Sequence, residues 1–348
     1  MNRRIPEIDG ARCLCNYLIV LHHSFTVSQF CGLCIIEYEV WNVIHNITHS
    51  TLAALFFVSG YCMALGYSES QYWKKVKRRL LRLGVPFIAW NFIFIIIYCI
   101  LAMHVPLMRE RLEAWGVDSV NGFFTHMFNP MLRPADGPLW FIRTLLFYAL
   151  AFPLVWRIFE MDKCVVLLVL IGMWFFLSTF FGWERQLLYS FPVYSLFAFI
   201  FGSWCARGNF ALSRLTSGNV IIVCAMVLIV RCLFGSSSEL LGSWIWELNA
   251  MAGIPVWLAL GKWLAVRVDG NGIYESLKGV AYFVYAGHIL VCPFISHGLA
   301  RIMRIDFHGK MSLLAVAYAI GGVLVCWGVK KVLDRRAPFI AKLLNGEL

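Results

Sequence analysis

The chain has 348 residues, of which 60% are hydrophobic, 16% aromatic and only 14% charged. This composition excludes an ordinary soluble domain, in which about a quarter of the residues are charged, and predicts an integral membrane protein. The formal net charge of +11 fits contact with anionic lipid headgroups better than nucleic-acid binding, and we expect no nucleic-acid partner.

Ten apolar stretches are long enough to cross a bilayer, which takes about 20 residues of helix. They lie at residues 14–35, 51–67, 84–103, 138–157, 164–182, 189–206, 218–233, 244–265, 280–300 and 312–333. We therefore predict an all-α polytopic membrane protein with about ten transmembrane helices, forming a single domain over residues 1–348. The first stretch is too long for the core of a signal peptide and is expected to be retained.

The positive charges predict how these helices are oriented. With the N-terminus inside, about two thirds of the Lys and Arg residues fall in inner segments, as the positive-inside rule requires. An even number of spans then places the C-terminus in the cytoplasm as well, and residues 334–348 are expected to form a short cytoplasmic tail.

A polar stripe runs along the first apolar stretch and comprises Asp9, Arg12, Asn16 and His23. At about 100° per residue, Arg12 and His23 return to nearly the same helix face, roughly 16 Å apart along the axis. Ionisable groups inside a membrane are expensive and usually functional. The stripe therefore predicts a reaction site about half a bilayer below a charged entrance.

A basic run at residues 74–82 follows in the first inner loop. On a helix, Arg78, Arg79 and Arg82 are close enough for their guanidinium groups to converge on one polyanion, such as a phosphorylated ligand. The alternative is an anchor in which the same side chains bind lipid phosphates.

The outer segments carry the remaining polar candidates. Residues 104–137 are too polar to span and long enough to shape access to a cavity, whereas residues 36–50 have the mixed character of an interfacial helix. Cys31 and Cys34 have a C-x-x-C spacing that an oxidising compartment would permit to form a bridge, although most cysteines here are expected to be packing residues. His45 and His49 have metal-ligand spacing without an evident third ligand, and we expect no metal.

Four residues of later spans are candidates for the acceptor side. Trp140 and Arg143 lie at the predicted outer start of the fourth span, and Tyr282 and His288 lie on the ninth. For the two aromatic residues the alternative is membrane anchoring, and for His288 it is a satisfied core position. Arg143 is harder to explain as an anchor because it lies about one turn inside an apolar segment.

A phosphate site at the inner surface and a deep histidine fit one ligand that extends from one to the other, and coenzyme A has that shape. In this hypothesis Asn16 binds the pantetheine amides of acyl-CoA, Arg12 orients the donor or is balanced by Asp9, and His23 is the general base or a transient acyl carrier. An acceptor arriving from the opposite side would receive the acyl group.

Five motifs in order resemble those of the bacterial membrane-bound acyltransferase family 3. They are Ile8-Asp9-Gly10-Ala11-Arg12 with His23 after ten further residues, Leu55-Phe56-Phe57-Val58-Ser59-Gly60-Tyr61, Arg78-Arg79-Leu80-Leu81-Arg82, Gly137-Pro138-Leu139-Trp140-Phe141-Ile142 and Tyr282-Phe283-Val284-Tyr285-Ala286-Gly287-His288. Ala281 departs from the serine that often precedes the last motif, and we expect no hydrolase-like domain after the membrane part.

The resemblance implies a multi-pass protein of the bacterial inner membrane that O-acylates cell-surface carbohydrates. Acyl-CoA, usually acetyl-CoA, would be the cytoplasmic donor, and a hydroxyl of an extracytoplasmic or lipid-linked carbohydrate would be the acceptor. The sequence leaves open the acceptor, the acyl chain length and the oligomeric state, for which a homo-oligomer is one alternative.

Two functions of other classes remain open from the residues. Intramembrane charges also mark the pathway of a secondary transporter or a flippase for a lipid-linked sugar or another anionic substrate, although no pair of broken helices in corresponding halves supports it. A sensor of acyl-CoA without catalysis is the third alternative, and the sequence offers no separate output domain for it.

Overall fold

The computed structural model describes residues 5–30, 38–104, 106–161, 163–181, 192–234, 239–268, 270–303 and 311–347, and these residues form helices and connecting turns without a strand. The first half of the chain contains α1 (Pro6–Phe30), α2 (Tyr38–Ala64), η1 (Glu69–Gln71), α3 (Tyr72–Arg79), η2 (Leu80–Gly84), α4 (Val85–His104), α5 (Pro106–Ala114), α6 (Val120–Phe128), η3 (Gly137–Leu139), α7 (Trp140–Leu150) and α8 (Phe152–Ile158). The second half contains α9 (Lys163–Phe181), α10 (Val193–Arg207), α11 (Leu212–Leu215), α12 (Gly218–Phe234), α13 (Glu239–Arg267), α14 (Gly272–Met303), α15 (Met311–Arg336) and α16 (Pro338–Asn345).

Each of the ten predicted apolar stretches overlaps a long helix or, at residues 138–157, the successive helices α7 and α8. Of the described residues, four helical segments are long and apolar enough to cross a membrane: Val43–Ala64, Glu69–His104, Ile245–Arg267 and Ala315–Arg336. The pair α7 and α8 makes a fifth if it counts as one span, bent by 61° where Pro153 enters the first turn of α8. The protein is thus an all-helical, multi-pass membrane protein, while ten spans and the orientation remain predictions.

Large apolar side chains cover much of the outside of the helices, which is the arrangement that lipid contact requires. Ile96 on α4 is 54% exposed, Leu168 on α9 is 70% exposed, and Leu233 on α12 is 70% exposed. A water-facing surface would leave this apolar area unfavourably hydrated, so these faces support a membrane location.

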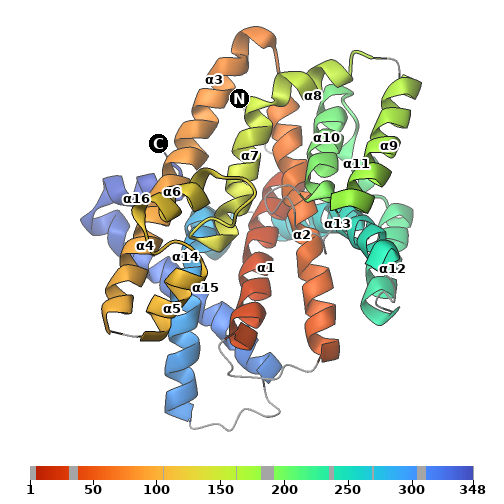
Figure 1. Ribbon diagram of the computed structural model, residues 1–348. Helices are drawn as coiled ribbons and strands as arrows, with labels where there is room; N and C mark the ends of the chain where they lie inside the picture. Colours follow the sequence, from red (N-terminus) through yellow and green to blue (C-terminus); the bar gives the residue numbers. More distant parts are fainter. Residues whose placement is uncertain are drawn as a thin grey trace.

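Helix α1 lies in the middle of the bundle, where it packs against α2, α13, α14 and α15 (Figure 1). Two glycine contacts bring the helices close together. A Cβ added at Gly10 would overlap the carbonyl group of Gly261 on α13, and one at Gly60 on α2 would overlap the carbonyl group of Phe199 on α10. Both glycines belong to motifs singled out in the sequence, and their physical role is to fix how α1 and α2 sit in the bundle.

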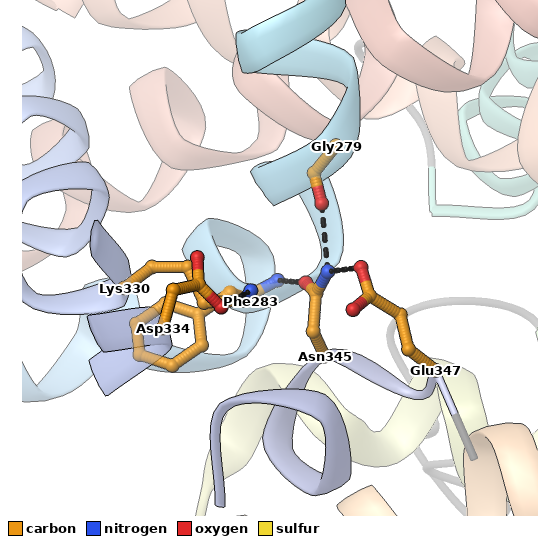
Figure 2. A network of polar contacts seen from close by, with 6 residues as sticks. All are labelled: Gly279, Phe283, Lys330, Asp334, Asn345 and Glu347. Carbon is orange, nitrogen blue, oxygen red and sulfur yellow. Dashed lines mark hydrogen bonds and ion pairs between the residues drawn. The ribbon is translucent and has the colours of Figure 1, made fainter. Parts of the chain in front are cut away.

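The chain after α15 forms one further short helix, α16. Helix α16 begins at Pro338, a residue that suits the first turn of a helix, and it packs on the bundle through the buried Asn345. Figure 2 shows the side-chain amide nitrogen of Asn345 donating to the backbone oxygen of Gly279 at 2.7 Å and to the Glu347 carboxylate at 2.5 Å. The side-chain oxygen of Asn345 accepts a hydrogen bond from the backbone N–H of Phe283 at 3.0 Å. The C-terminal segment is therefore tied to α14.

One expectation for the predicted outer segments changes. Residues 38–50 are the first part of α2 and run without a break into its apolar part, because no helix-breaking residue separates the two. Residues 104–137 contain the short helices α5 and α6. Cys31 and Cys34 lie outside the described residues.

Candidate functional site

His23 and His288 are in contact, although they are 265 positions apart in the chain. Nδ1 of His23 lies 2.9 Å from Nε2 of His288, and the ring centroids are 5.1 Å apart. His23 comes from α1 and the fully buried His288 from α14. The structure thus brings the two predicted histidines into direct contact.

The hydrogen-bond partners assign the tautomers of the neutral pair. Nδ1 of His288 lies 2.6 Å from the backbone oxygen of Tyr285, which only accepts, so this nitrogen carries the proton. Nε2 of His288 is then an acceptor, and His23 donates to it from Nδ1. The remaining nitrogen of His23, Nε2, holds a lone pair that is available to take a proton.

Further histidines lie near this pair, one on α1 and others on α2. His22 donates from Nδ1 to Thr48 Oγ1 at 2.9 Å, because the Thr48 hydroxyl is already donated to the backbone oxygen of Ile44 at 2.6 Å. His45 and His49 pack on Trp246 with ring-centroid distances of 5.3 and 3.9 Å. Within the described residues, no three His, Cys, Asp or Glu side chains form a group able to hold a metal ion.

Arg12 and Arg79 both reach the end of α2 that follows Ser59. Arg79 donates to the hydroxyl and the backbone oxygen of Ser59, each at 2.9 Å, while Nη2 of Arg12 lies 3.7 Å from Cys62 Sγ. The two guanidinium groups are near enough to interact electrostatically as like charges. In the described part of the chain neither forms an ion pair with a carboxylate, which is an arrangement that favours an anionic ligand.

The other predicted donor-site residues lie on α1, on α3 and in the turn after α3. Arg78 and Arg82 are exposed, the latter in the π-helical turn that joins α3 to α4. Asn16 is half-buried on α1, between Arg12 and His23. Asp9 is also half-buried, but Arg12 extends toward α2, and no ion pair between the two is present in the described residues.

Arg143 is buried and forms hydrogen bonds with the backbone of the predicted outer segment. It donates from Nη1 to the backbone oxygens of His126 at 2.8 Å and Met127 at 3.2 Å, and from Nη2 to that of Leu132. These bonds fold the chain after α6 against α7, so the guanidinium positions the loop. Trp140, one turn earlier, packs against Phe56 of α2 at a centroid distance of 6.0 Å.

Tyr282 lies six residues before His288 on α14, and its hydroxyl group is shielded from solvent. It interacts electrostatically with the carboxylate of Asp136, which is fully buried and was not among the residues chosen from the sequence. An acidic residue in a polar loop normally indicates a solvated position, so the sequence held no clear signal for its burial.

A family model described as an acyltransferase domain, of acyltransferase family 3, matches residues 5–331. Neither the curated proteins nor the solved structures include a match. The matched residues contain both histidines and all the arginines described above.

Proposed function

Because the chain belongs to acyltransferase family 3, and acyl transfer is thereby its activity, we propose that it transfers an acetyl group from acetyl-CoA to a carbohydrate hydroxyl. The observation that carries this proposal is the His23–His288 contact, in which His23 lies on the same helix as Arg12 and is more buried than Arg12. The reaction would take place in a multi-pass protein of a bacterial inner membrane.

His23 is the general base of the proposed reaction. Its Nε2 removes the proton of the acceptor hydroxyl as the oxygen attacks the carbonyl carbon of the thioester, forming the new C–O bond. The tetrahedral intermediate collapses with cleavage of the C–S bond, and the imidazolium returns the proton to the departing thiolate. The products are the ester and free coenzyme A, so atoms and charges balance without a further reactant.

His288 is the positioning residue for this base. It accepts the hydrogen bond from Nδ1 of His23 at 2.9 Å, which keeps Nε2 unprotonated in the resting state. As His23 gains a proton, the same hydrogen bond becomes charge-assisted and stronger. The backbone oxygen of Tyr285 fixes the orientation of His288 in turn.

Arg12 and Arg79 bind phosphate groups of the donor in this proposal, with Arg78 and Arg82 at the exposed margin. His23 lies eleven positions after Arg12 on the helix, which corresponds to roughly 16 Å along its axis. An extended pantetheine arm bridges a distance of this order, with Asn16 beside its amides. The donor would thus enter from the cytoplasm and present its thioester to His23, while the acceptor approaches from the other face.

Binding of radiolabelled acetyl-CoA to the detergent-purified protein tests this proposal. Arg12→Ala is expected to weaken binding about tenfold or more, the effect of losing a charge-assisted hydrogen bond. The exposed Arg336 on α15 provides the matched control, and Arg336→Ala is expected to bind as the wild type does. Wild-type protein that does not bind acetyl-CoA would contradict the proposed donor and favour transport of an anionic substrate.

A further inference from the structure

Asp136 is fully buried, yet within the described residues neither oxygen of its carboxyl group has a hydrogen-bond partner. It immediately precedes η3, which is docked on α14 because Tyr285 donates its hydroxyl to the backbone oxygen of Pro138. Buried polar atoms are normally hydrogen-bonded, since an unsatisfied one loses its hydration without compensation. Two such atoms on one side chain indicate that their partner is a ligand.

A second unsatisfied group and a compensating charge lie near this carboxyl group. The hydroxyl of Tyr282 is buried without a hydrogen-bond partner in the described part of the chain, and it interacts electrostatically with Asp136. Burial raises the pKa of Asp136 well above its usual range, and the charge of Arg133 opposes that shift. Arg133 also interacts electrostatically with His23, so these groups belong to the surroundings of the reacting histidine.

Helices α1 and α14 run parallel, which fixes the depth of Tyr282. Tyr17 donates its hydroxyl to the backbone oxygen of Leu277 at 2.7 Å, and the histidine pair joins the same two helices further along both, at 2.9 Å. Tyr282 lies between these two contacts, six positions or roughly 9 Å along the axis before the histidine of α14. Because Arg12 precedes Tyr17 on α1, Tyr282 lies at a depth between Arg12 and the histidine pair.

The pantetheine arm of acetyl-CoA spans this same interval in the proposed function, from its phosphates at Arg12 to its thioester at His23. The arm carries two amide groups between its sulfur and its phosphates. Each amide offers an N–H donor and a carbonyl acceptor, so the arm can pair with a carboxylate, with a protonated carboxyl group and with a tyrosine hydroxyl. A ligand in this interval thus has the polar groups that Asp136 and Tyr282 lack.

We infer that Asp136 and Tyr282 bind the amide groups of the pantetheine arm of acetyl-CoA and thereby hold its thioester at His23. The inference rests on the proposed function and deepens it, because Arg12 and Arg79 contact only the phosphates of the donor. Tyr282 takes a donor contact in place of the acceptor contact expected from its sequence position. An arm that is held along its length keeps the reacting carbonyl in place, which is how positioning lowers a barrier.

Displacement of radiolabelled acetyl-CoA from the detergent-purified protein tests the inference, with CoA and 3′-phospho-ADP, the nucleotide part of CoA without the arm, as competitors. Asp136→Asn and Tyr282→Phe are expected to weaken CoA binding about tenfold and about fivefold and to leave 3′-phospho-ADP binding unchanged. Arg12→Ala should weaken both competitors. The exposed Asp118 gives the control Asp118→Asn, which should behave as the wild type. If Asp136→Asn does not fold, Tyr282→Phe carries the same test.

Two acetyl-CoA analogues, in each of which an ester oxygen replaces one amide N–H, identify the amide that Asp136 binds. With the analogue that lacks the bound N–H, the wild type and Asp136→Asn should have equal affinity, as in a double-mutant cycle. A loss in Asp136→Asn that persists with both analogues would overturn the inference.

Three further results would overturn the inference and leave the proposed donor standing. They are unchanged CoA binding in both variants, an equal loss of CoA and 3′-phospho-ADP binding in both variants, and equal affinity of the wild type for the two competitors. Absence of acetyl-CoA binding by the wild type would instead defeat the proposed function itself.

Discussion

Replacing His288 by leucine removes the acceptor of the hydrogen bond from His23 Nδ1, which is 2.9 Å long, while keeping an apolar side chain of similar size in the buried position. His23 would remain in place on α1, but nothing would hold its Nε2 as the unprotonated nitrogen. The imidazolium formed during the reaction would also lose its nearest acceptor. We therefore expect His288→Leu to slow acyl transfer more than it affects donor binding.

The magnitude follows from how the hydrogen bond changes during the reaction. A bond between neutral groups is worth about 0.5–1.5 kcal/mol and one to a charged group about 1.5–3 kcal/mol. The gain on protonation of His23 is thus about 1–2 kcal/mol, which corresponds to a loss of roughly 5- to 30-fold in kcat. His288→Gln, whose amide oxygen accepts a hydrogen bond, should lose less.

Initial rates of acetyl transfer by the purified variants measure this effect, with binding of acetyl-CoA measured on the same samples. The exposed His104 at the end of α4 supplies the control His104→Leu. In a His23→Ala background the further change His288→Leu should have no effect, because the two residues act through one bond. A fully active His288→Leu variant, or additive losses in the double variant, would refute the reasoning.

Three further predictions concern thermal unfolding in detergent and the acceptor side. Gly10→Ala should destabilise the protein by about 1–3 kcal/mol through overlap with Gly261, while Gly172→Ala, at an open position of α9, should not; equal melting temperatures would contradict the close packing of α1 and α13. Asn345→Ala should cost about 1–3 kcal/mol because it leaves the backbone groups of Gly279 and Phe283 without their partner; an unchanged melting temperature would show that α16 is not tied to α14 as described. Arg143→Met should release the backbone oxygens of His126 and Leu132 and raise KM for the acceptor while KM for acetyl-CoA stays constant; a selective effect on the donor would argue against its role in the outer segment.

The pattern of α1 shows how far the sequence predicts the site. Helical periodicity places Arg12 and His23 on one face, and the structure has both on α1. Their partners, Cys62 and His288, lie 50 and 265 residues away in sequence, and no local pattern indicates which distant residue a side chain will meet. The same limit applies to the basic run, in which Arg79 turns inward to Ser59 while Arg78 stays exposed.

Asp136 and α16 illustrate what local patterns leave out. The burial of Asp136 depends on the docking of η3 through Tyr285 and Pro138, a contact across 147 residues. The end of the chain carries a proline followed by apolar residues, which is a helix-start signal, but its anchor at Asn345 depends on carbonyl and amide groups of α14 that only the folded bundle brings near. In both cases the deciding interaction is tertiary.

Transfer of the labelled acetyl group from acetyl-CoA by His23→Ala, compared with wild type in the same preparation, tests the central claim most directly. The account predicts that the variant binds acetyl-CoA as the wild type does and transfers about 10²- to 10⁴-fold more slowly, the usual contribution of a general base. Transfer by His23→Ala at the wild-type rate would contradict the assignment of His23 as the base.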